Sequence, residues 1–381
     1  MRFGRSARPL WSLDPSGIFL NHGSFGAAPR VVQEEQGRFR LQMEEQPDQF
    51  FDRIGPTGER PAIRAVADEL GSYVGVSGER IALVENATVG TQAVLQSVEL
   101  SHGDEILITD HQYPAVREAV DVRCRESGAT ARVVNIPLPT TAPAVRAAIR
   151  AAAHPRVKLA IVDHITSPTA LVFPIREIVT DLHEAGIPVF VDGAHAVGQI
   201  PVSIPEIEPD WYVCNLHKWG YAARGSALLY ADPAVAGRTR PAIVSHCIDL
   251  GFPRSFDWVG TRDYSAWLSV PKALEFLAEL HAQGLRTHNE RIITLASERL
   301  AAIGAETVGP TEMCAAMRSF VFPHGAARQE DPKELRRVLW DEHRIQVWAG
   351  WYQGAFVLRV SAQAYVGDED VLALADALCA R

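Results

Sequence analysis

Residues 157–195 read VKLAIVDHITSPTALVFPIREIVTDLHEAGIPVFVDGAH and hold two apolar runs with a helical pattern between them. The first run, at 157–165, is nearly continuous in β-rich residues, as expected of a strand covered on both faces. The segment 174–186 has apolar residues at helical spacing, and the second run closes at Asp192. This order predicts two parallel strands joined by a crossover helix.

The same alternation extends outward from this stretch, from residue 61 to about residue 230. Helical patterns such as 61–75 and 114–128 separate further β-rich runs, which lie at 81–86, 105–110, 131–138, 210–219 and 226–231. Strands that alternate with helices are typical of the α/β class with a mostly parallel sheet. We therefore predict this fold class.

The length of 381 residues exceeds one domain of about 150 residues. Beyond residue 233 the alternation weakens, and a long helical pattern at 264–284 precedes elements that suit a smaller mixed domain. The first fifty residues are rich in Gly and Pro and are expected to be irregular, with FLNHGSFGAAPR (19–30) as a functional loop. The predicted organisation is an N-terminal segment that joins the small domain, a large domain and a small domain, at 1–50, 51–260 and 261–381.

Composition narrows the class of protein. The 37 basic and 46 acidic residues give a net charge of -9, which disfavours nucleic acid and anionic membranes as partners. No run of 18 apolar residues predicts a membrane-spanning helix, and the first residues do not resemble a secretory signal. Five cysteines without a close pair predict neither a disulfide framework nor a zinc site, and favour the cytoplasm.

Common nucleotide, zinc-protease and serine-hydrolase motifs are missing from the sequence. Candidate residues instead follow successive predicted strands, where open α/β sheets bind ligands. Asn86, Ala87 and Thr88 open a predicted helix, whose free N–H groups suit an anion, although Asn and Thr are also common helix caps. His111 and Tyr113 follow the strand at 105–110, where an aromatic ring either stacks on a planar ligand or packs in the core.

Asp192 and Lys218 are the two residues whose chemistry indicates a cofactor. Asp192 closes the run PVFVD, His195 follows it, and Lys218 lies 26 positions after Asp192 in NLHKWG (215–220). A buried lysine with a lowered pKa is a nucleophilic amine that forms Schiff bases, whereas a surface lysine would have no such role. An acid that pairs with a pyridinium nitrogen and a lysine that holds an aldehyde together suit pyridoxal 5'-phosphate.

Eight ordered motifs then resemble the class V aminotransferase family of fold type I pyridoxal-phosphate enzymes, in its isopenicillin N epimerase-like branch. These motifs are LNHGSFGAAPR, ENATVGTQAVL, DHQYPAV, HITSPTALVFP, VDGAHAVGQ, NLHKWG, VGTRDYSAW and LRVSAQAYV, and they span residues 20–366. The resemblance implies a large domain with a mostly parallel, seven-stranded type of sheet and a smaller α+β domain.

The resemblance also implies residue roles. Lys218 would form the internal aldimine and move the substrate proton, Asp192 would pair with the pyridine nitrogen, and His195 would bind the phenolic oxygen. The phosphate would be held by Ala87, Thr88, Asn215 and His217, with Thr261 reaching it across a homodimer interface. His111 would stack on the ring, with Tyr113 as second choice. Arg359 would bind the substrate carboxylate, and Asn21, His22 and Ser24 would line the substrate side.

Two departures from the family pattern affect function. Many relatives carry an Asn near the cofactor oxygen where this chain reads ITSPT, so Ser167 or Thr169 would replace it. The stretch 315–378 has no cysteine, which disfavours the persulfide chemistry of desulfurases. The corresponding loop, 344–354, offers Trp348, Trp351 and Tyr352, which either border a substrate pocket or pack the small domain.

The function expected from these residues is catalysis at the α-carbon of an amino acid, through an external aldimine. We favour a carbon–sulfur β-lyase, because elimination needs only Lys218 and a good leaving group. An amino-acid epimerase stays open with His22 as a second acid, as does an aminotransferase. Two further alternatives are a metal-dependent hydrolase built on Asp192, His195 and His217, and a binding protein that keeps the cofactor as a regulator.

Overall fold

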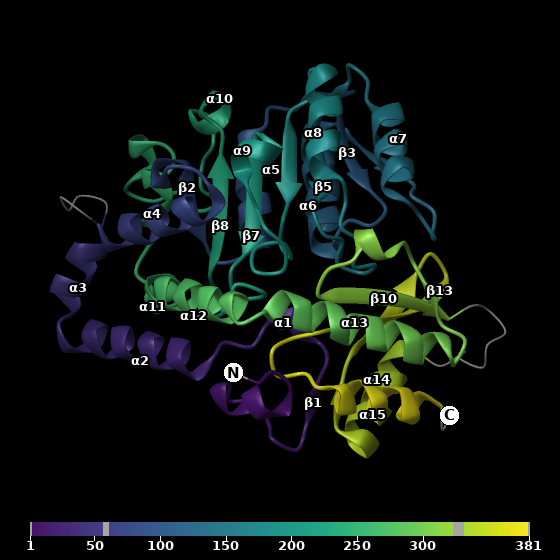
Figure 1. Ribbon diagram of the computed structural model, residues 1–381. Helices are drawn as coiled ribbons and strands as arrows, with labels where there is room; N and C mark the ends of the chain where they lie inside the picture. Colours follow the sequence, from purple (N-terminus) through teal and green to yellow (C-terminus); the bar gives the residue numbers. More distant parts are fainter. Residues whose placement is uncertain (1, 56–60, 323–330, 380–381) are drawn as a thin grey trace.

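A seven-stranded sheet forms the centre of the protein, whose computed structural model describes residues 2–55, 61–322 and 331–379 (Figure 1). Its strands are β2 (Ile81–Val84), β3 (Glu105–Thr109), β4 (Thr130–Val134), β5 (Val157–Asp163), β6 (Val189–Asp192), β7 (Trp211–Asn215) and β8 (Ala227–Ala231). They lie in the order β2-β8-β7-β6-β5-β3-β4, and every neighbouring pair is parallel except the two that involve β8. The expected α/β class with a mostly parallel sheet is confirmed.

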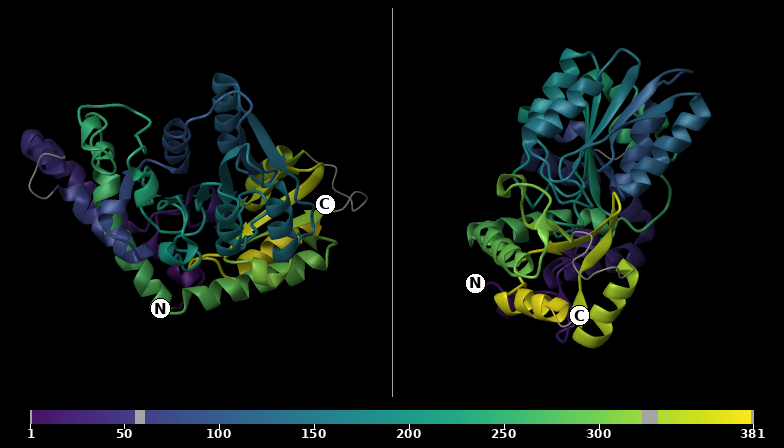
Figure 2. Two further views of the ribbon diagram at one scale, coloured as in Figure 1. Left: turned by 90° about the horizontal axis from the view of Figure 1, so that it is seen from above. Right: turned by 90° about the vertical axis from the view of Figure 1, so that its right-hand side faces the viewer.

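Helices cover both faces of this sheet (Figure 2). One face packs on α4 (Ala62–Val74), α7 (Ala142–Ala152) and α8 (Ile175–Glu184), and the other packs on α5 (Ala87–Ser97) and α6 (Pro114–Ser127). Alternate residues of a strand enter different cores, as Leu107 and Ile108 of β3 do. Burial on both faces explains why the strands read as continuous apolar runs.

The carboxyl ends of the central strands place polar residues side by side. Asp163 at the end of β5 is in register with Asp192 at the end of β6, and Asp192 is in register with Val213 of β7. Asn215 ends β7, and the chain then turns through Lys218. Residues that end separate strands therefore meet at one edge of the sheet.

The smaller domain is built on a four-stranded antiparallel sheet that lies below the large sheet in Figure 1. Its strands are β9 (Glu306–Thr307), β10 (Met317–Phe322), β12 (Trp348–Tyr352) and β13 (Ala355–Ser361). The helices α13 (Leu285–Ala301), α14 (Pro332–His343) and α15 (Asp368–Cys379) complete it. The segment 344–354, expected as a loop, contains β12, whose backbone pairs with β13.

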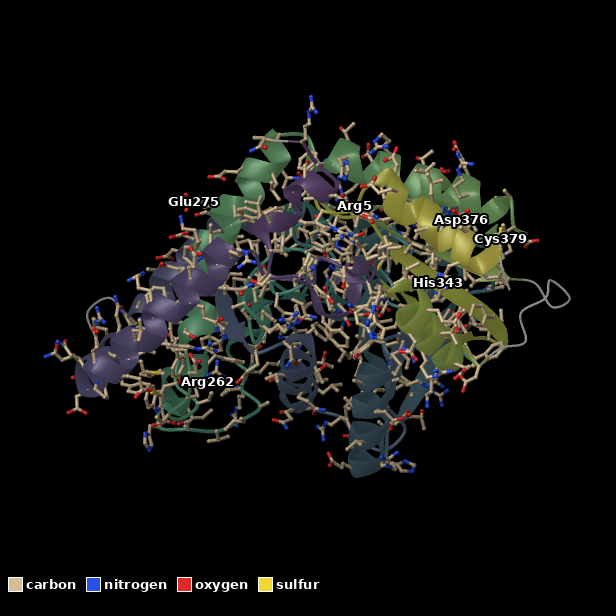
Figure 3. The ribbon with its side chains drawn as sticks, turned by 90° about the horizontal axis from the view of Figure 1, so that it is seen from below. Arg5, Arg262, Glu275, His343, Asp376 and Cys379 are labelled. Carbon is tan, nitrogen blue, oxygen red and sulfur yellow. The ribbon has the colours of Figure 1, made fainter. Side chains whose placement is uncertain are left out.

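The first twenty residues pack against this smaller domain. β1 (Ile18–Phe19) pairs in parallel with β11 (Ile345–Gln346), and Trp11 lies in the core of the small domain. The 3-10 helix η1 (Arg5–Leu10) lies against α15, where Arg5 and Arg8 each approach the buried Asp370 to 3.1 Å (Figure 3).

Residues 30–54 are helical, so the expectation of an irregular N-terminal segment is wrong there. They form α2 (Arg30–Glu45) and α3 (Pro47–Ile54), and Val32 and Phe50 enter a core of the large domain. The apolar periodicity that marks a helix is weak in α2, because its residues are mostly polar and Val32 is its buried one.

The helical pattern at 264–284 forms two helices, α11 (Ser265–Leu268) and α12 (Val270–Ala282), with Pro271 in the first turn of α12. α12 connects the two cores, because Leu274 packs in the large domain and Phe276 in the small one. The chain therefore passes from the core of the large domain to that of the small domain within α12. This point lies later in the chain than the boundary predicted between residues 260 and 261.

Membrane crossing needs about 20 predominantly apolar residues in one helix. The longest helix in the described part of the chain, α13, has 17 residues and carries charged side chains. Among the described residues, no helix is both long and apolar enough to span a bilayer.

Candidate active site

A cavity of about 190 Å³ lies at the carboxyl edge of the large sheet. Its walls come from the start of α5, the ends of β5, β6 and β7, the turn after β7 and the N-terminal loop. The lining residues are Ser24, Phe25, Asn86, Ala87, Thr88, Tyr113, Val116, Asp163, Ile165, Ser167, Asp192, Ala194, His195, Asn215, His217 and Lys218. The structure thus brings together most of the residues expected from the sequence.

The start of α5 forms one end of the cavity. Asn86 caps the helix, since its side-chain oxygen accepts the N–H of Val89 at 3.0 Å. Asn215 Oδ1 accepts the N–H of Ala87 at 2.8 Å. The Ala87 N–H, expected on a phosphate, is therefore already used here, and Thr88 remains beside the cavity with its hydroxyl.

His217 lies at the same end of the cavity. Its Nδ1 is 3.1 Å from the carbonyl oxygen of Ser226, an acceptor, so Nδ1 carries the proton and Nε2 is a free acceptor in the neutral ring. Burial, together with the charge of Lys218, lowers the pKa of His217 to about 4. An incoming anion would favour protonation of the His217 ring and would then gain a charged contact with it.

Two carboxylates form another wall of the cavity. The amide of Gln112 donates to Asp163 and to Asp192, at 3.4 Å in each case. Burial, followed by the negative charge of Asp192, raises the pKa of Asp163 well above its usual range. Burial also raises the pKa of Asp192, but the Ala194 N–H and the charge of Lys218 oppose the rise. Asp192 is therefore the better placed of the two to stay ionised.

Lys218 lies at the base of the cavity. Its Nζ is 3.1 Å from His195 Nε2 and 6.0 Å from the centre of the Tyr113 ring. Burial, followed by the positive charge of Arg359, lowers the pKa of Lys218 to about 8. A lysine in this state supplies a free amine near neutral pH.

The structure reverses the expected order of His111 and Tyr113. His111 is buried, and its ring nitrogens contact Thr169 Oγ1 at 2.7 Å and the Ile136 carbonyl at 3.0 Å. It is not among the lining residues of the cavity, whereas Tyr113 is. Thr169 is occupied by His111, so of the two residues expected to replace the Asn, Ser167 is the one that lines the cavity.

Arg359 lies just behind the cavity wall on β13. Its guanidinium donates to Ser24 Oγ at 2.9 Å and to the Ser167 carbonyl at 2.5 Å, and both serines line the cavity. Burial lowers the pKa of Arg359 to about 10. Trp348, opposite on β12, stacks on the guanidinium with 5.2 Å between Arg359 Cζ and the ring centre.

The residues of the N-terminal loop divide into two groups. Ser24 donates to Asn21 Oδ1 at 2.7 Å, so Asn21 supports the serine that contacts Arg359. His22 is fully buried, with Nδ1 2.7 Å from Tyr365 Oη and Nε2 3.0 Å from the Lys218 carbonyl. His22 therefore holds the backbone of Lys218, and the expectation that it lines the substrate side is wrong.

Three other expected residues lie away from the cavity lining. Trp351 is 52% exposed on β12, and Tyr352 packs against His111 with ring centres 4.9 Å apart. Thr261 is exposed, in the segment before α11. Its expected contact would need a second copy of the chain.

Asp163, Gln112 and Phe25 contribute to the site although the sequence analysis missed them. Asp163 ends the run LAIVD just as Asp192 ends PVFVD, so the same signal could have found it. Phe25 lines the cavity while 67% exposed. Gln112 has no comparable signal, because its partners come from two other strands.

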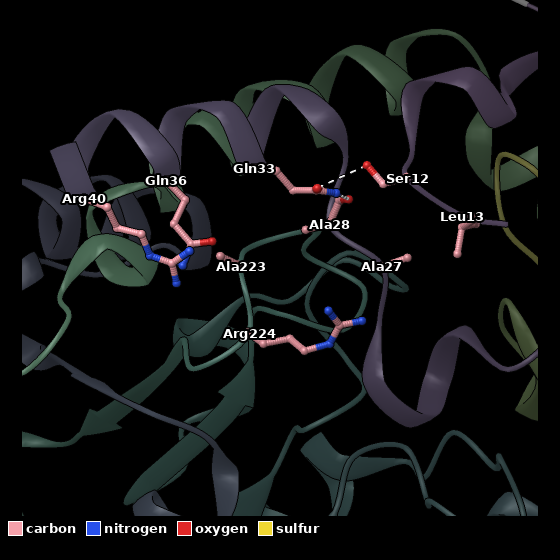
Figure 4. A pocket seen from close by; sticks show the side chains of 9 residues that line it. All are labelled: Ser12, Leu13, Ala27, Ala28, Gln33, Gln36, Arg40, Ala223 and Arg224. Carbon is pink, nitrogen blue, oxygen red and sulfur yellow. Dashed lines mark hydrogen bonds between the residues drawn. The ribbon is translucent and has the colours of Figure 1, made fainter.

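A larger cavity, of about 440 Å³, lies elsewhere, between the start of α2 and the residues around Arg224 (Figure 4). Arg224 there donates to the Gly26 carbonyl, and Arg40 pairs with Asp263. Its lining contains no Asp, Glu, His, Cys or Lys among the described residues. Chemistry, not volume, therefore identifies the smaller cavity as the site.

The metal-site alternative finds no donor set in the described part of the chain, where no three His, Cys, Asp or Glu side chains gather in a suitable way. Both ring nitrogens of His195 are also engaged, one near Lys218 and one with the indole of Trp219. Cys314, the cysteine that precedes the cysteine-free stretch, lies outside the cavity, and burial raises its pKa to about 11.

A doubly covered α/β sheet with an acid and a buried lysine at neighbouring strand ends defines a fold type I pyridoxal-phosphate-dependent enzyme. A family model described as "Aminotransferase class-V" matches residues 62–374. The chain belongs to the class V aminotransferase family.

Individual relatives agree with this assignment. The chain is 33% identical to a putative L-cysteine desulfhydrase 1 of Oryza sativa subsp. japonica, over 86% of this chain and 72% of the relative. It is 32% identical to the isopenicillin N epimerase of Streptomyces clavuligerus, over 98% and 96%. The solved structure of a cysteine desulfurase from Thermococcus onnurineus NA1 superposes with a TM-score of 0.83 at 16% identity, covering 99% and 98%, which shows the shared fold.

Proposed function

We propose that the chain binds pyridoxal 5'-phosphate in this cavity and acts as a carbon–sulfur β-lyase on L-cysteine or an S-substituted cysteine. The fit to the cofactor is supported by the lining. A protein acid, a lysine amine and a helix start lie on separate walls of one cavity, with the Tyr113 ring beside it. These are the contacts that a pyridine ring, an aldehyde and a phosphate require.

Different residues of the cavity would bind different parts of the cofactor. Asp192 would accept a hydrogen bond from the protonated ring nitrogen, Thr88, His217 and the start of α5 would bind the phosphate, and Lys218 would hold the aldehyde. Tyr113 would stack on the ring, and His195 would donate to the phenolic oxygen. When bound, the cofactor delocalises the electron pair left at the α-carbon of an amino acid.

Arg359 and Lys218 would act on the substrate. Arg359, with Ser24 and Ser167 beside it, would fix the α-carboxylate through two N–H donors. In the loaded enzyme the free amine of Lys218 would serve as the base that removes the proton from the α-carbon, and its lowered pKa suits proton removal near neutral pH.

The observation that favours elimination over epimerisation is the position of His22. Epimerisation needs a second acid on the opposite face of the substrate, and His22 is the candidate for it. Both its nitrogens are occupied, and burial lowers its pKa to about 4. Elimination needs one base and a leaving group, so that a cysteine thioether and water yield a thiol, pyruvate and ammonium.

The relatives support both elimination and epimerisation, each on a different ground. The desulfhydrase relatives match the proposed bond cleavage, while the epimerase relative covers almost the whole chain. Epimerisation is therefore the second candidate, and transamination the third. The five cysteines are all free, which suits a reducing compartment such as the cytoplasm.

The deciding experiment incubates the holoenzyme with three kinds of substrate. These are L-cysteine, S-substituted cysteines, and peptides in which one carbon carries both a free amine and a free carboxylate. We expect stoichiometric pyruvate and thiol or sulfide, and no product with Lys218→Ala. Reactions in D₂O report the competing outcome. Deuterium uptake and inversion at the α-carbon without pyruvate would instead establish the epimerase.

A further inference from the structure

Trp219 directly follows Lys218 and contacts the same histidine as that lysine. Its indole Nε1 lies 3.3 Å from His195 Nδ1, and Lys218 Nζ lies 3.1 Å from His195 Nε2. Trp219 is 1% exposed and His195 is 2% exposed. One imidazole therefore joins the indole to the amine, out of contact with bulk water.

The indole determines which nitrogen of His195 carries the proton. An indole N–H only donates, so Nδ1 must accept and has no hydrogen of its own. The proton of the neutral ring is then on Nε2, which faces Lys218. A doubly protonated ring would direct its Nδ1–H at the indole N–H, and burial lowers the pKa of His195 well below its usual range.

We propose that Trp219 is a positioning residue that fixes the Nε2–H tautomer of His195, so that His195 donates toward Lys218 and, in the loaded enzyme, toward the cofactor's phenolic oxygen. This inference deepens the proposed function and relies on its use of Lys218. The neutral amine of Lys218 accepts the Nε2–H, whereas the ammonium form has no lone pair to do so. The contact therefore favours the form of the lysine that reacts with an aldehyde.

The surroundings hold Trp219 in this orientation. Gly198 has a φ of 88°, and a Cβ there would lie 2.1 Å from the Trp219 carbonyl oxygen. A Cβ on Gly23 would lie 3.5 Å from the indole ring, and the ring of His22 is 5.1 Å away. Met317 and Ile165 pack against it. The indole is therefore held tightly enough to act as a fixed donor.

Other charged groups also act on this pair, and none of them selects a nitrogen of His195. Those that affect the pKa of Lys218 or His195 are Arg359, Asp192, Cys214, His217 and His22. They change the energy of each charged form but leave the two neutral tautomers to be decided by hydrogen bonds. Trp219→Phe therefore removes the selecting contact and leaves these charges in place.

The first test measures the tautomer in the full-length protein freed of cofactor. Proteins labelled with ¹⁵N-histidine are compared by NMR, with the signals of His195 identified by their loss in His195→Gln. We expect a protonated Nε2 and a bare Nδ1 in the native chain. A protonated Nδ1 in the native chain would overturn the proposal without recourse to any variant of Trp219.

The second test uses Trp219→Phe, with Trp211→Phe as the matched control. Trp211 is also buried, and its indole donates to Thr239 Oγ1 at 2.9 Å, but it begins β7, at the strand end opposite Lys218. The rate at which pyridoxal phosphate condenses with Lys218, with loss of water, is followed by the visible band from pH 6 to 10.

We expect Trp219→Phe to shift the pH midpoint of this rate upward from about 8. Its His195 can adopt the Nδ1–H tautomer, whose bare Nε2 accepts from the Lys218 ammonium and stabilises it. One such hydrogen bond corresponds to a rate loss of up to about tenfold near pH 7.5. Trp211→Phe should keep the native midpoint even where both variants unfold at a lower temperature. An unchanged midpoint in Trp219→Phe would refute the proposal, and because neither test uses an amino acid, failure of the lyase reaction would not affect either result.

Discussion

Asp163 lies beside Asp192, although the proposed contact with the ring nitrogen needs only one carboxylate. Its Oδ2 has no partner among the described residues, and its pKa is raised first by burial and then by Asp192. We interpret Asp163 as a neutral acid. A neutral Asp163 leaves the negative charge to Asp192, the residue proposed to pair with the ring nitrogen.

This interpretation predicts different results for two isosteric substitutions. Asp163→Asn replaces a neutral acid by a neutral amide, so the affinity for pyridoxal phosphate and the position of its visible band should change little. Asp192→Asn removes the proposed charged partner, and a charge-assisted contact of about 1.5–3 kcal/mol corresponds to at least tenfold weaker binding. Titration of each full-length protein by visible absorbance measures both. Equal losses in the two variants would show that Asp163 is ionised.

At the scale of residues, the sequence indicated the site residues that lie at or just after the end of a strand. Asp192 and Lys218 are of this kind, because apolar runs mark where the strands stop. The burial of His22 and the use of the Ala87 N–H were not predicted, because their partners, Tyr365 and Asn215, are distant in sequence. Hydrogen bonds between such positions follow from packing and leave no local pattern.

At the scale of elements, the start of α5 combines a structural and a proposed binding role. Asn86 caps the helix, and Thr88 in the same turn lines the cavity that would hold the phosphate. The cap of α7 offers a comparison, because Thr141 accepts the N–H of Ala144 in an element whose residues do not line the cavity.

We predict that Asn86→Ala lowers the free energy of unfolding by about 1 kcal/mol and also weakens cofactor binding. Thr141→Ala should lower stability by a similar amount and leave cofactor binding unchanged. Chemical denaturation and absorbance titration separate the two effects. Unchanged cofactor affinity in Asn86→Ala would show that this helix start does not hold the phosphate.

The elements themselves followed from the sequence where apolar periodicity is strong. The strands of the large sheet, α4 and α6 lie close to their predicted positions. α2 was missed because its polar residues contribute little burial, and β12 was expected as a loop because tryptophans and glycines gave no clear alternation. Tertiary pairing with β13 determines that strand.

At the scale of the whole molecule, an exposed apolar segment precedes Thr261. Ile243 is 55% exposed, Val244 70% and Leu250 51%. Such exposure suits a surface that a second copy of the chain covers, which would bring Thr261 to the partner's site as the family resemblance implies.

We predict a homodimer whose interface includes this segment. Val244→Glu should shift the mass measured by light scattering from two chains toward one and weaken cofactor binding, because Thr261 would no longer reach the second site. Val122→Glu, at another exposed valine, which lies on α6, is the control and should stay dimeric. A native protein that is monomeric at micromolar concentration would contradict the prediction.

The pairing of β1 with β11 has a consequence for the order in which the protein matures. The residues of β1 find their partners 327 positions later in the chain, as Ile18 does in Ile345. The large domain has its own cores and can form early, whereas the loop that carries His22 and Ser24 must wait for Tyr365 and Arg359. A nascent chain thus acquires the proposed pocket only after Arg359 and Tyr365 have been synthesised.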